Sequence, residues 1–177
     1  MLRSGLFGRR LRIDDALVVT VRAAGGRIRR DFEQGGYPFA AWRGADMNGW
    51  PERFALVGEG GVPLLLWASD EPLLRDGGRT FYRPTQLEAA ESVHGRGVGQ
   101  AGLEAMAARA IEIGLNEIAL FSLDRYDSPR AHPFYVRNGA VPHCFETLVA
   151  DAIPLRLPSD RVRALAEQFE RRCRDAE

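Results

Sequence analysis

The most informative part of the sequence is a glycine-rich loop, His94-Gly95-Arg96-Gly97-Val98-Gly99-Gln100. Its glycines occupy alternate positions, so the backbone can approach a ligand closely and turn several N–H groups in the same direction. A helical pattern begins at Val98, and the N-terminus of a helix attracts negative charge. The loop therefore predicts a site for phosphate or pyrophosphate.

Regular elements follow this loop. Apolar residues at helical spacing predict a helix over 98–113, which Gly114 ends. The almost continuously apolar residues 117–123 predict a strand that is covered on both faces. A short helix over about 131–137 comes next and ends at Asn138-Gly139. Residues 141–157 supply two further strands or one bent strand.

The remaining segments have weaker patterns. The chain is expected to end in a helix over 159–177, with Ser159 as its N-cap and an apolar face of Val162, Leu165 and Phe169. In the first half of the chain, the sequence predicts a strand at 16–21, a short helix at 27–34 and an aromatic-rich loop at 35–52. A hairpin of 54–57 with 62–68 follows, then a polar connection at 70–78 and a strand at 79–89 that Pro84 interrupts.

Length and composition describe an ordinary globular protein. The chain has 177 residues and a mass of 19.6 kDa, which suits one domain over 1–177. Its 24 basic residues balance 24 acidic ones, and every basic residue is an arginine. Without lysine there is no P-loop lysine, no lysine Schiff base with pyridoxal phosphate, and no kinase-type strand lysine.

The charge is unevenly distributed along the chain. Residues 1–30 carry eight arginines and two acidic residues, a net charge of +6. We interpret residues 1–15 as a solvated basic arm, which is suited to a polyanionic partner. The longest apolar runs, such as 62–68, are too short to span a bilayer, so no membrane partner is expected.

The cysteine and histidine residues favour a reducing compartment and no metal. Cys144 and Cys173 form neither a CxxC pair nor a disulfide framework, so we expect a cytoplasmic protein. Together with His132 and His143, Cys144 also lacks metal-ligand spacing.

A dinucleotide-binding protein is one alternative. Residues 97–102 match the pattern GxGxxG, and Asp124 lies about 20 residues further on. The segment before the loop, residues 90–94, is a poor buried strand, however, and only 75 residues follow Gly102.

Taken together, two motifs resemble the GNAT superfamily of acyl-CoA-dependent N-acetyltransferases over about residues 80–150. The pyrophosphate loop of that superfamily, (Arg/Gln)-x-x-Gly-x-(Gly/Ala), falls on His94, Gly97 and Gly99. Its second signature is matched by Ser128, Ala131, Phe134, Tyr135, Gly139 and Ala140. The chain departs from the pattern at His94, where Arg or Gln is usual, and at Ser128, where Asn is usual. The loop and the segment 155–158 also look like those of tRNA-acetylating toxins in the same superfamily.

The resemblance implies an α+β fold. A mixed, mostly antiparallel twisted sheet would be flanked by helices, with a central splayed pair of parallel strands at 86–89 and 118–123. The pantetheine arm of acetyl-CoA would lie in that gap, and a backbone N–H near Leu87 to Ala89 would polarise the thioester carbonyl. The pyrophosphate would be held by backbone amides from Gly95 to Gln100, with the Arg96 side chain free to add charge. The implied cofactor-binding residues are Leu87, Ala89, His94, Gly95, Arg96, Gly97, Val98, Gly99, Gln100, Ser128, Ala131 and Phe134.

The same resemblance suggests catalytic residues. Tyr135 would be the general acid, because a phenol with a pKa of about 10 can return a proton to a thiolate whose thiol has a pKa of about 8.5. Glu88 and Glu91 are candidates for a general base, and Asp46 is a lesser one. Bringing amine and thioester together can also supply much of the rate without a dedicated base.

The leading hypothesis is therefore an acetyltransferase that uses acetyl-CoA to modify a primary amine of a small molecule, peptide or protein. Three alternatives stay open: a toxin that acetylates aminoacyl-tRNA, a non-catalytic acyl-CoA-binding module, and an NAD-binding protein. The basic residues Arg27, Arg29 and Arg30 keep the tRNA alternative open. The apolar stripe of the last helix favours docking on the protein's own core, and dimerisation through the stripe is the second possibility. A monomer or a homodimer is therefore expected.

Overall fold

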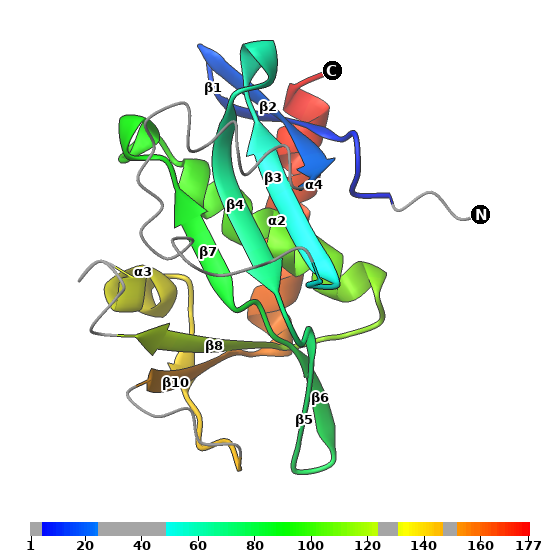
Figure 1. Cartoon of the computed structure of the whole chain (residues 1–177), viewed down its shortest axis with the longest axis vertical. Helices are drawn as coiled ribbons and strands as arrows, with labels where there is room; N and C mark the ends of the chain where they lie inside the picture. The colour runs from blue at the N-terminus through cyan, green and yellow to red at the C-terminus, as the bar shows by residue number, and fades with distance from the viewer. Residues whose placement is uncertain (1–4, 25–48, 124–130, 147–151) are drawn as a thin grey trace.

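The computed structural model describes residues 5–24, 49–123, 131–146 and 152–177 (Figure 1). Within these ranges one antiparallel sheet has the strand order β1-β2-β3-β4-β7. Its strands are β1 (Arg10–Asp14), β2 (Leu17–Ala23), β3 (Glu52–Val57), β4 (Pro63–Ser69) and β7 (Gln86–Ala89). The predicted strand at 16–21 and the hairpin of 54–57 with 62–68 are confirmed by β2, β3 and β4.

A second sheet has the order β5-β6-β8-β10-β9. Its strands are β5 (Leu73–Asp76), β6 (Arg79–Tyr82), β8 (Ile118–Leu123), β10 (Ala152–Leu157) and β9 (Val141–Pro142). The described residues within 141–157 thus form two strands. β6 and β8 are parallel and pair at Tyr82 and Ile118, whereas the other pairs are antiparallel.

The two sheets separate at Pro84. Just before it, the amide of Tyr82 donates to the carbonyl of Glu117, 3.0 Å away, beside β8. Just after it, the amide of Thr85 donates to the carbonyl of Ala68 on β4, 2.9 Å away. The chain therefore leaves β8 and joins β4, so that β7 and β8 diverge (Figure 1). This confirms both the interruption at Pro84 and the splayed strands of a mixed α+β fold.

Helices cover one face of the first sheet. They are α2 (Val98–Glu112) and α4 (Ser159–Asp175), which contact each other behind that sheet (Figure 1). α2 lies so close to β4 that a Cβ atom at Gly102 would be 2.5 Å from Cδ1 of Leu65. Gly102, the last glycine of the GxGxxG pattern, is thus explained by helix–sheet packing. A shorter helix, α3 (Ala131–Arg137), and the 3-10 turns η2 (Glu59–Gly61) and η3 (Glu91–Val93) complete the described elements.

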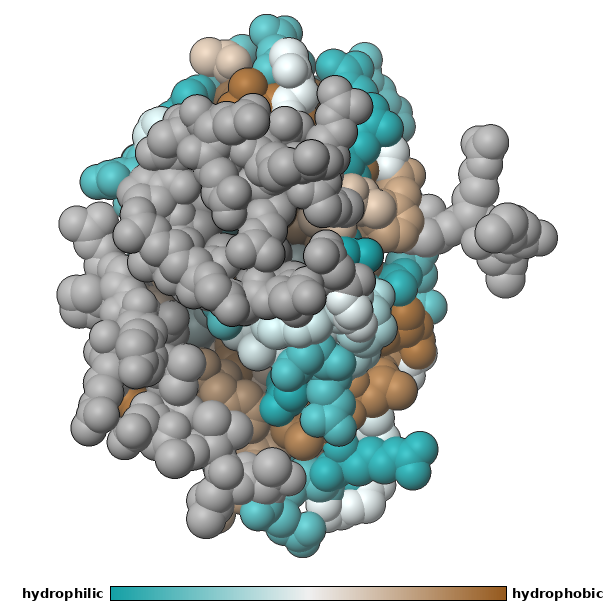
Figure 2. Space-filling model, in the orientation of Figure 1, coloured by the Kyte–Doolittle hydropathy of each residue, from teal (hydrophilic) through white to brown (hydrophobic). Residues whose placement is uncertain are grey.

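The described surface and interior differ in polarity as expected for a folded domain. The main core contains fully buried Phe54, Trp67, Tyr82 and Met106. In the view of Figure 2, hydrophilic residues occupy much of the upper rim, where β1 and β2 lie, and the larger hydrophobic areas are in the lower half. No helix in the described ranges is long and apolar enough to cross a membrane.

Three segments differ from the predictions. The expected polar connection at 70–78 contains β5, whose Leu74 is buried with Phe81, Ala119 and Phe145. The expected basic arm at 1–15 contains β1, whose Leu11 is fully buried. The N-cap of α4 is Pro158 rather than Ser159, and no side chain caps that helix by a hydrogen bond. The predicted helix at 27–34 and residues 35–48 of the predicted loop at 35–52 lie outside the described residues, whereas Glu52, the last residue of that loop, begins β3.

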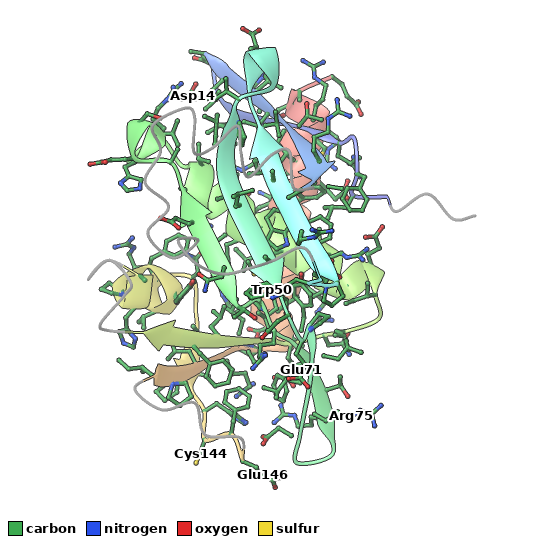
Figure 3. All side chains as sticks on the ribbon, viewed as in Figure 1. Asp14, Trp50, Glu71, Arg75, Cys144 and Glu146 are labelled. Carbon is green, nitrogen blue, oxygen red and sulfur yellow. The ribbon has the colours of Figure 1, made fainter. Side chains whose placement is uncertain are left out.

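The two cysteines are expected to react very differently with iodoacetamide in the native protein. Cys144 is exposed at the lower edge of the molecule (Figure 3). Cys173 on α4 is 4% exposed, and burial raises the pKa of its thiol to about 11, so little reactive thiolate forms near neutral pH. Mass spectrometry should find Cys144 alkylated and Cys173 unmodified until urea is added, with Cys144→Ser as the control. Equal native labelling would contradict the packing of α4.

Candidate functional site

The glycine-rich loop adopts a conformation that depends on glycine. It runs from η3 to α2, and Gly95 and Gly97 have φ values of +80° and +90°, a region that other residues rarely occupy. Gly97 is the N-cap of α2. A Cβ atom built at Gly95 or Gly99 would meet no heavy atom within 4 Å. The loop thus presents open backbone directly before a helix of 15 residues.

Several amides of this loop are available as donors. The first amides of a helix have no carbonyl partner within the helix, which applies to Val98, Gly99 and Gln100. Among the described residues, the amides of Gly95 and of 97–100 donate to no backbone carbonyl. The expected donors from Gly95 to Gln100 include the amide of Arg96. That amide donates instead to the carbonyl of Val93, 3.2 Å away, so it is not available to a ligand.

The side chain of Arg96 also differs from the expectation that it is free to add charge. Its Nη2 lies 3.1 Å from Oδ2 of Asp14, at the end of β1 beside the loop (Figure 3). The pKa of Asp14 is lowered, first by the hydrogen bond from the Ala16 amide and then by Arg96. The expectation of a free Arg96 was wrong, because its guanidinium pairs with Asp14. Asp14 belongs to a strand that is distant in sequence, and the ion pair connects the loop to β1.

His94 connects the loop to β7. The side chain is exposed, and its Nε2 lies 3.3 Å from the carbonyl oxygen of Ala89. The histidine that stands where Arg or Gln is usual therefore contacts the strand edge from which the loop departs.

Among the described residues, β7 has a strand neighbour on one side only, so its other edge is open. It is the last strand of its sheet, and the amide of Ala90 donates to the carbonyl of Leu64 on β4, 2.8 Å away. Because hydrogen bonding alternates along an antiparallel strand, the amides of Leu87 and Ala89 point away from β4, toward the side where β8 diverges. Glu88 is half-buried and has its side chain on the face opposite to those of Leu87 and Ala89.

The second predicted motif lies on α3. Ala131, Phe134 and Tyr135 are half-buried; the rings of Phe134 and Tyr135 are 5.5 Å apart and pack against the main core. The C-terminal end of α3 contacts the first turn of α2, because Nε2 of Gln100 donates to Oδ1 of Asn138, 2.7 Å away. The structure thus brings the Tyr135 helix next to the loop. Ser128 and Asp46 lie outside the described residues.

Sequence reasoning missed two residues of this site. Asp14 gives no local signal, because its partner Arg96 is 82 positions away. The sequence predicts Asn138 only as part of the Asn-Gly stop of α3. The structure shows that this residue is 7% exposed and that its side chain bridges two helices. Glu91, one candidate for a base, is exposed in η3.

Comparison with known proteins finds solved structures that are similar to this one but no match by sequence. No family model and no curated protein matches the sequence. Among solved structures, a Klebsiella pneumoniae protein assigned as an acyl-CoA N-acyltransferase is 16% identical, with a TM-score of 0.60 over 80% of this chain and 97% of that one. A GNAT-family acetyltransferase from Listeria monocytogenes is 14% identical, with a TM-score of 0.57 over 84% of this chain and 99% of that one.

A third similar structure contains acetyl-CoA. AtaTR bound with acetyl-CoA is 14% identical to this chain, with a TM-score of 0.55 over 83% of this chain and 97% of that one. At such identities the likeness concerns the fold. The diverging β7 and β8, the glycine-rich loop before α2 and these neighbours lead to one conclusion: the chain has the fold of the GNAT acyl-CoA N-acetyltransferases.

Proposed function

We propose that this protein is an N-acetyltransferase that transfers the acetyl group of acetyl-CoA to a primary amine by direct attack. The observation that carries the proposal is the meeting of three features at one place: the open first turn of α2, the open edge of β7, and the helix that holds Tyr135. The first would bind the pyrophosphate of acetyl-CoA, the second would contact the thioester carbonyl, and the third would donate a proton to the leaving thiolate. All three belong to the described part of the chain.

The residues present fit the anionic part of the cofactor. Backbone amides at a helix N-terminus bind phosphate groups without a cationic side chain. We assign this role to the amides of Gly95 and of 97–100, whose surroundings are open at Gly95 and Gly99. Val98, by contrast, has a fully buried side chain, so it contributes only its backbone. Arg96 is assigned to holding the loop through Asp14.

The remaining residues are assigned to the transfer step. The amine nitrogen attacks the thioester carbonyl carbon, and the new C–N bond replaces the C–S bond. An amide of Leu87 or Ala89 at the open edge of β7 would stabilise the developing negative charge on the carbonyl oxygen. The leaving thiolate takes a proton from the Tyr135 hydroxyl, and the proton lost by the amine passes to Glu88 or to solvent. The Tyr135 phenolate then regains a proton from solvent, and Glu88 releases its proton to solvent, which restores both groups.

We propose a small-molecule or peptide amine as the acceptor in preference to aminoacyl-tRNA. The chain has no net charge, and seven of its described arginines pair with carboxylates: Arg9, Arg79, Arg83, Arg96, Arg109, Arg156 and Arg172. Paired arginines contribute little to a surface for phosphates. Arg27, Arg29 and Arg30 lie outside the described residues. Acetyl transfer measured on a panel with both kinds of acceptor distinguishes the two.

Acetyl-CoA is expected to raise the melting temperature of the protein. At a concentration of ~100 Kd a ligand adds about 2.7 kcal/mol to the free energy of unfolding. For a domain of this size that corresponds to a shift of about 5–10 °C. Thermal unfolding is measured with acetyl-CoA, coenzyme A, NAD and no ligand. We expect shifts with the first two and none with NAD.

Two matched variants locate the binding site. Gly97→Glu places a strained, negatively charged residue in the loop and should abolish the shift. Gly78→Glu makes the same change at another glycine with positive φ and open surroundings, in the β5–β6 turn at the opposite end of the molecule (Figure 1), and should keep the shift. A shift with NAD alone would favour the dinucleotide alternative. No shift with any ligand would refute the proposal.

A further inference from the structure

The side chain of Asn138 is the point where the glycine-rich loop region and α3 are joined. It is 7% exposed, and both ends of its amide have partners. Oδ1 accepts a hydrogen bond from Nε2 of Gln100, 2.7 Å away. Nδ2 donates to the carbonyl of Phe134, 2.9 Å away, on α3 itself. An asparagine bound in this way has one orientation only, because its donor and acceptor ends cannot exchange.

Gln100 has a second, longer contact within α2. It is the third residue of α2, and its Nε2 also lies 3.4 Å from Oε1 of Glu104, one turn further along the helix. Glu104 is fully buried and accepts hydrogen bonds from Arg172 on α4. Both hydrogens of the Gln100 amide thus have acceptors, and the side chain is directed to Asn138 rather than to a ligand.

The helix α3 depends on such contacts for its position. It has seven residues, fewer than a helix needs to be stable by itself in water. Tyr135 lies three positions before Asn138, in the same turn, and its carbonyl accepts the amides of Asn138 and Ala140 at 3.1 and 3.0 Å. A shift of Asn138 therefore moves the backbone of Tyr135 with it.

We propose that Gln100 and Asn138 are positioning residues, which fix the Tyr135 hydroxyl relative to the cofactor-binding first turn of α2. The inference rests on the proposed acetyl transfer. It adds that the reaction requires the contact between Gln100 and Asn138, which the overall fold does not imply. The amide of Gln100 would hold the cofactor while its side chain holds the helix of the general acid. One residue would thus couple the binding of the cofactor to the placement of the proton donor.

The variant Gln100→Met tests this coupling. Methionine keeps the length of the side chain and the backbone amide but cannot donate to Asn138. We expect kcat to fall by roughly 10–100-fold, as for a displaced catalytic group. Because the cofactor amides remain, the KM for acetyl-CoA and the cofactor-induced shift in melting temperature should stay within about twofold of wild type. Gln168→Met, at an exposed position of α4, is the matched control and should be active.

A double variant separates positioning from a general loss of structure. If Gln100 acts through Tyr135, Gln100→Met should have little further effect on kcat once Tyr135→Phe is present. Asn138→Ala removes the other partner and should behave in the same way, which keeps the test valid if Gln100→Met folds poorly. A Gln100→Met effect that persists undiminished in the Tyr135→Phe background would overturn the proposal, as would an unchanged kcat. A wild-type protein that acetylates no amine would instead refute the proposed function itself.

Discussion

Phenylalanine at position 135 is expected to lower kcat for acetyl transfer by about 10²–10⁴-fold, the usual contribution of a general acid. The substitution removes only the hydroxyl. The ring, which packs with Phe134 against the main core, remains. The leaving thiolate must then take its proton from solvent. Steady-state release of free thiol from acetyl-CoA, measured with the best amine of a panel, gives kcat directly.

The cofactor-induced shift in melting temperature should survive in this variant, because the assigned phosphate donors are backbone amides of another element. Tyr82→Phe is a matched control, since Tyr82 is fully buried in the core and has no assigned role in the reaction. An unchanged kcat in Tyr135→Phe would show that the acid assignment is wrong. Loss of the shift together with kcat would place Tyr135 in cofactor binding.

The second half of the chain was predictable because its signals are local. The glycines before a helical pattern, the apolar strand at 117–123 and the Asn-Gly stop at 138–139 each reflect a short-range requirement of the backbone or of burial. The structure has α2, β8 and α3 at these places. Positive φ at Gly95, Gly97 and Gly139 explains why glycine stands there.

The sequence does not predict β1 or β5, and the reason differs between the two strands. In β1 the sequence Arg10-Leu11-Arg12-Ile13 alternates as a strand should, but its arginines favoured a solvated arm. Leu11 is fully buried, and Nε of Arg12 donates to the carbonyl of Asp175, so α4 supports the strand. β5 has four residues between turn-forming segments, too few for a pattern, and it exists because β6 pairs with it.

Contacts within the candidate site could not be predicted from local sequence. Arg96 pairs with a residue 82 positions away, and Gln100 bonds to one 38 positions away. Such partners are brought together by the packing of β1, α2 and α3, which no periodicity encodes. The backbone donors were predictable, since they follow from the glycines. The side chains that hold them in place were not.

Arg172→Met is expected to lower the free energy of unfolding by about 3–5 kcal/mol, because it leaves a buried carboxylate without its partner. Glu104 is 1% exposed on its side chain, and Arg172 from α4 is its charged partner. Arg172 also donates to the carbonyls of Arg12 and Ile13, so one guanidinium joins α2, α4 and the end of β1. For a domain of this size the loss corresponds to a fall in Tm of roughly 6–20 °C.

Two further variants decide whether the buried charge is the cause. Arg171→Met removes a neighbouring arginine that is exposed and forms no ion pair in the described structure, so its effect should be within about 0.5 kcal/mol. Glu104→Gln combined with Arg172→Met removes both charges and should recover much of the stability, because a neutral amide is far less costly to bury than a carboxylate. If the double variant is as unstable as Arg172→Met alone, the cost comes from the lost contacts of Arg172 with β1 instead. In that case the ion pair would contribute little to stability. The hydrogen bonds from Arg172 to the carbonyls of Arg12 and Ile13 would be the contacts that hold α4 against β1.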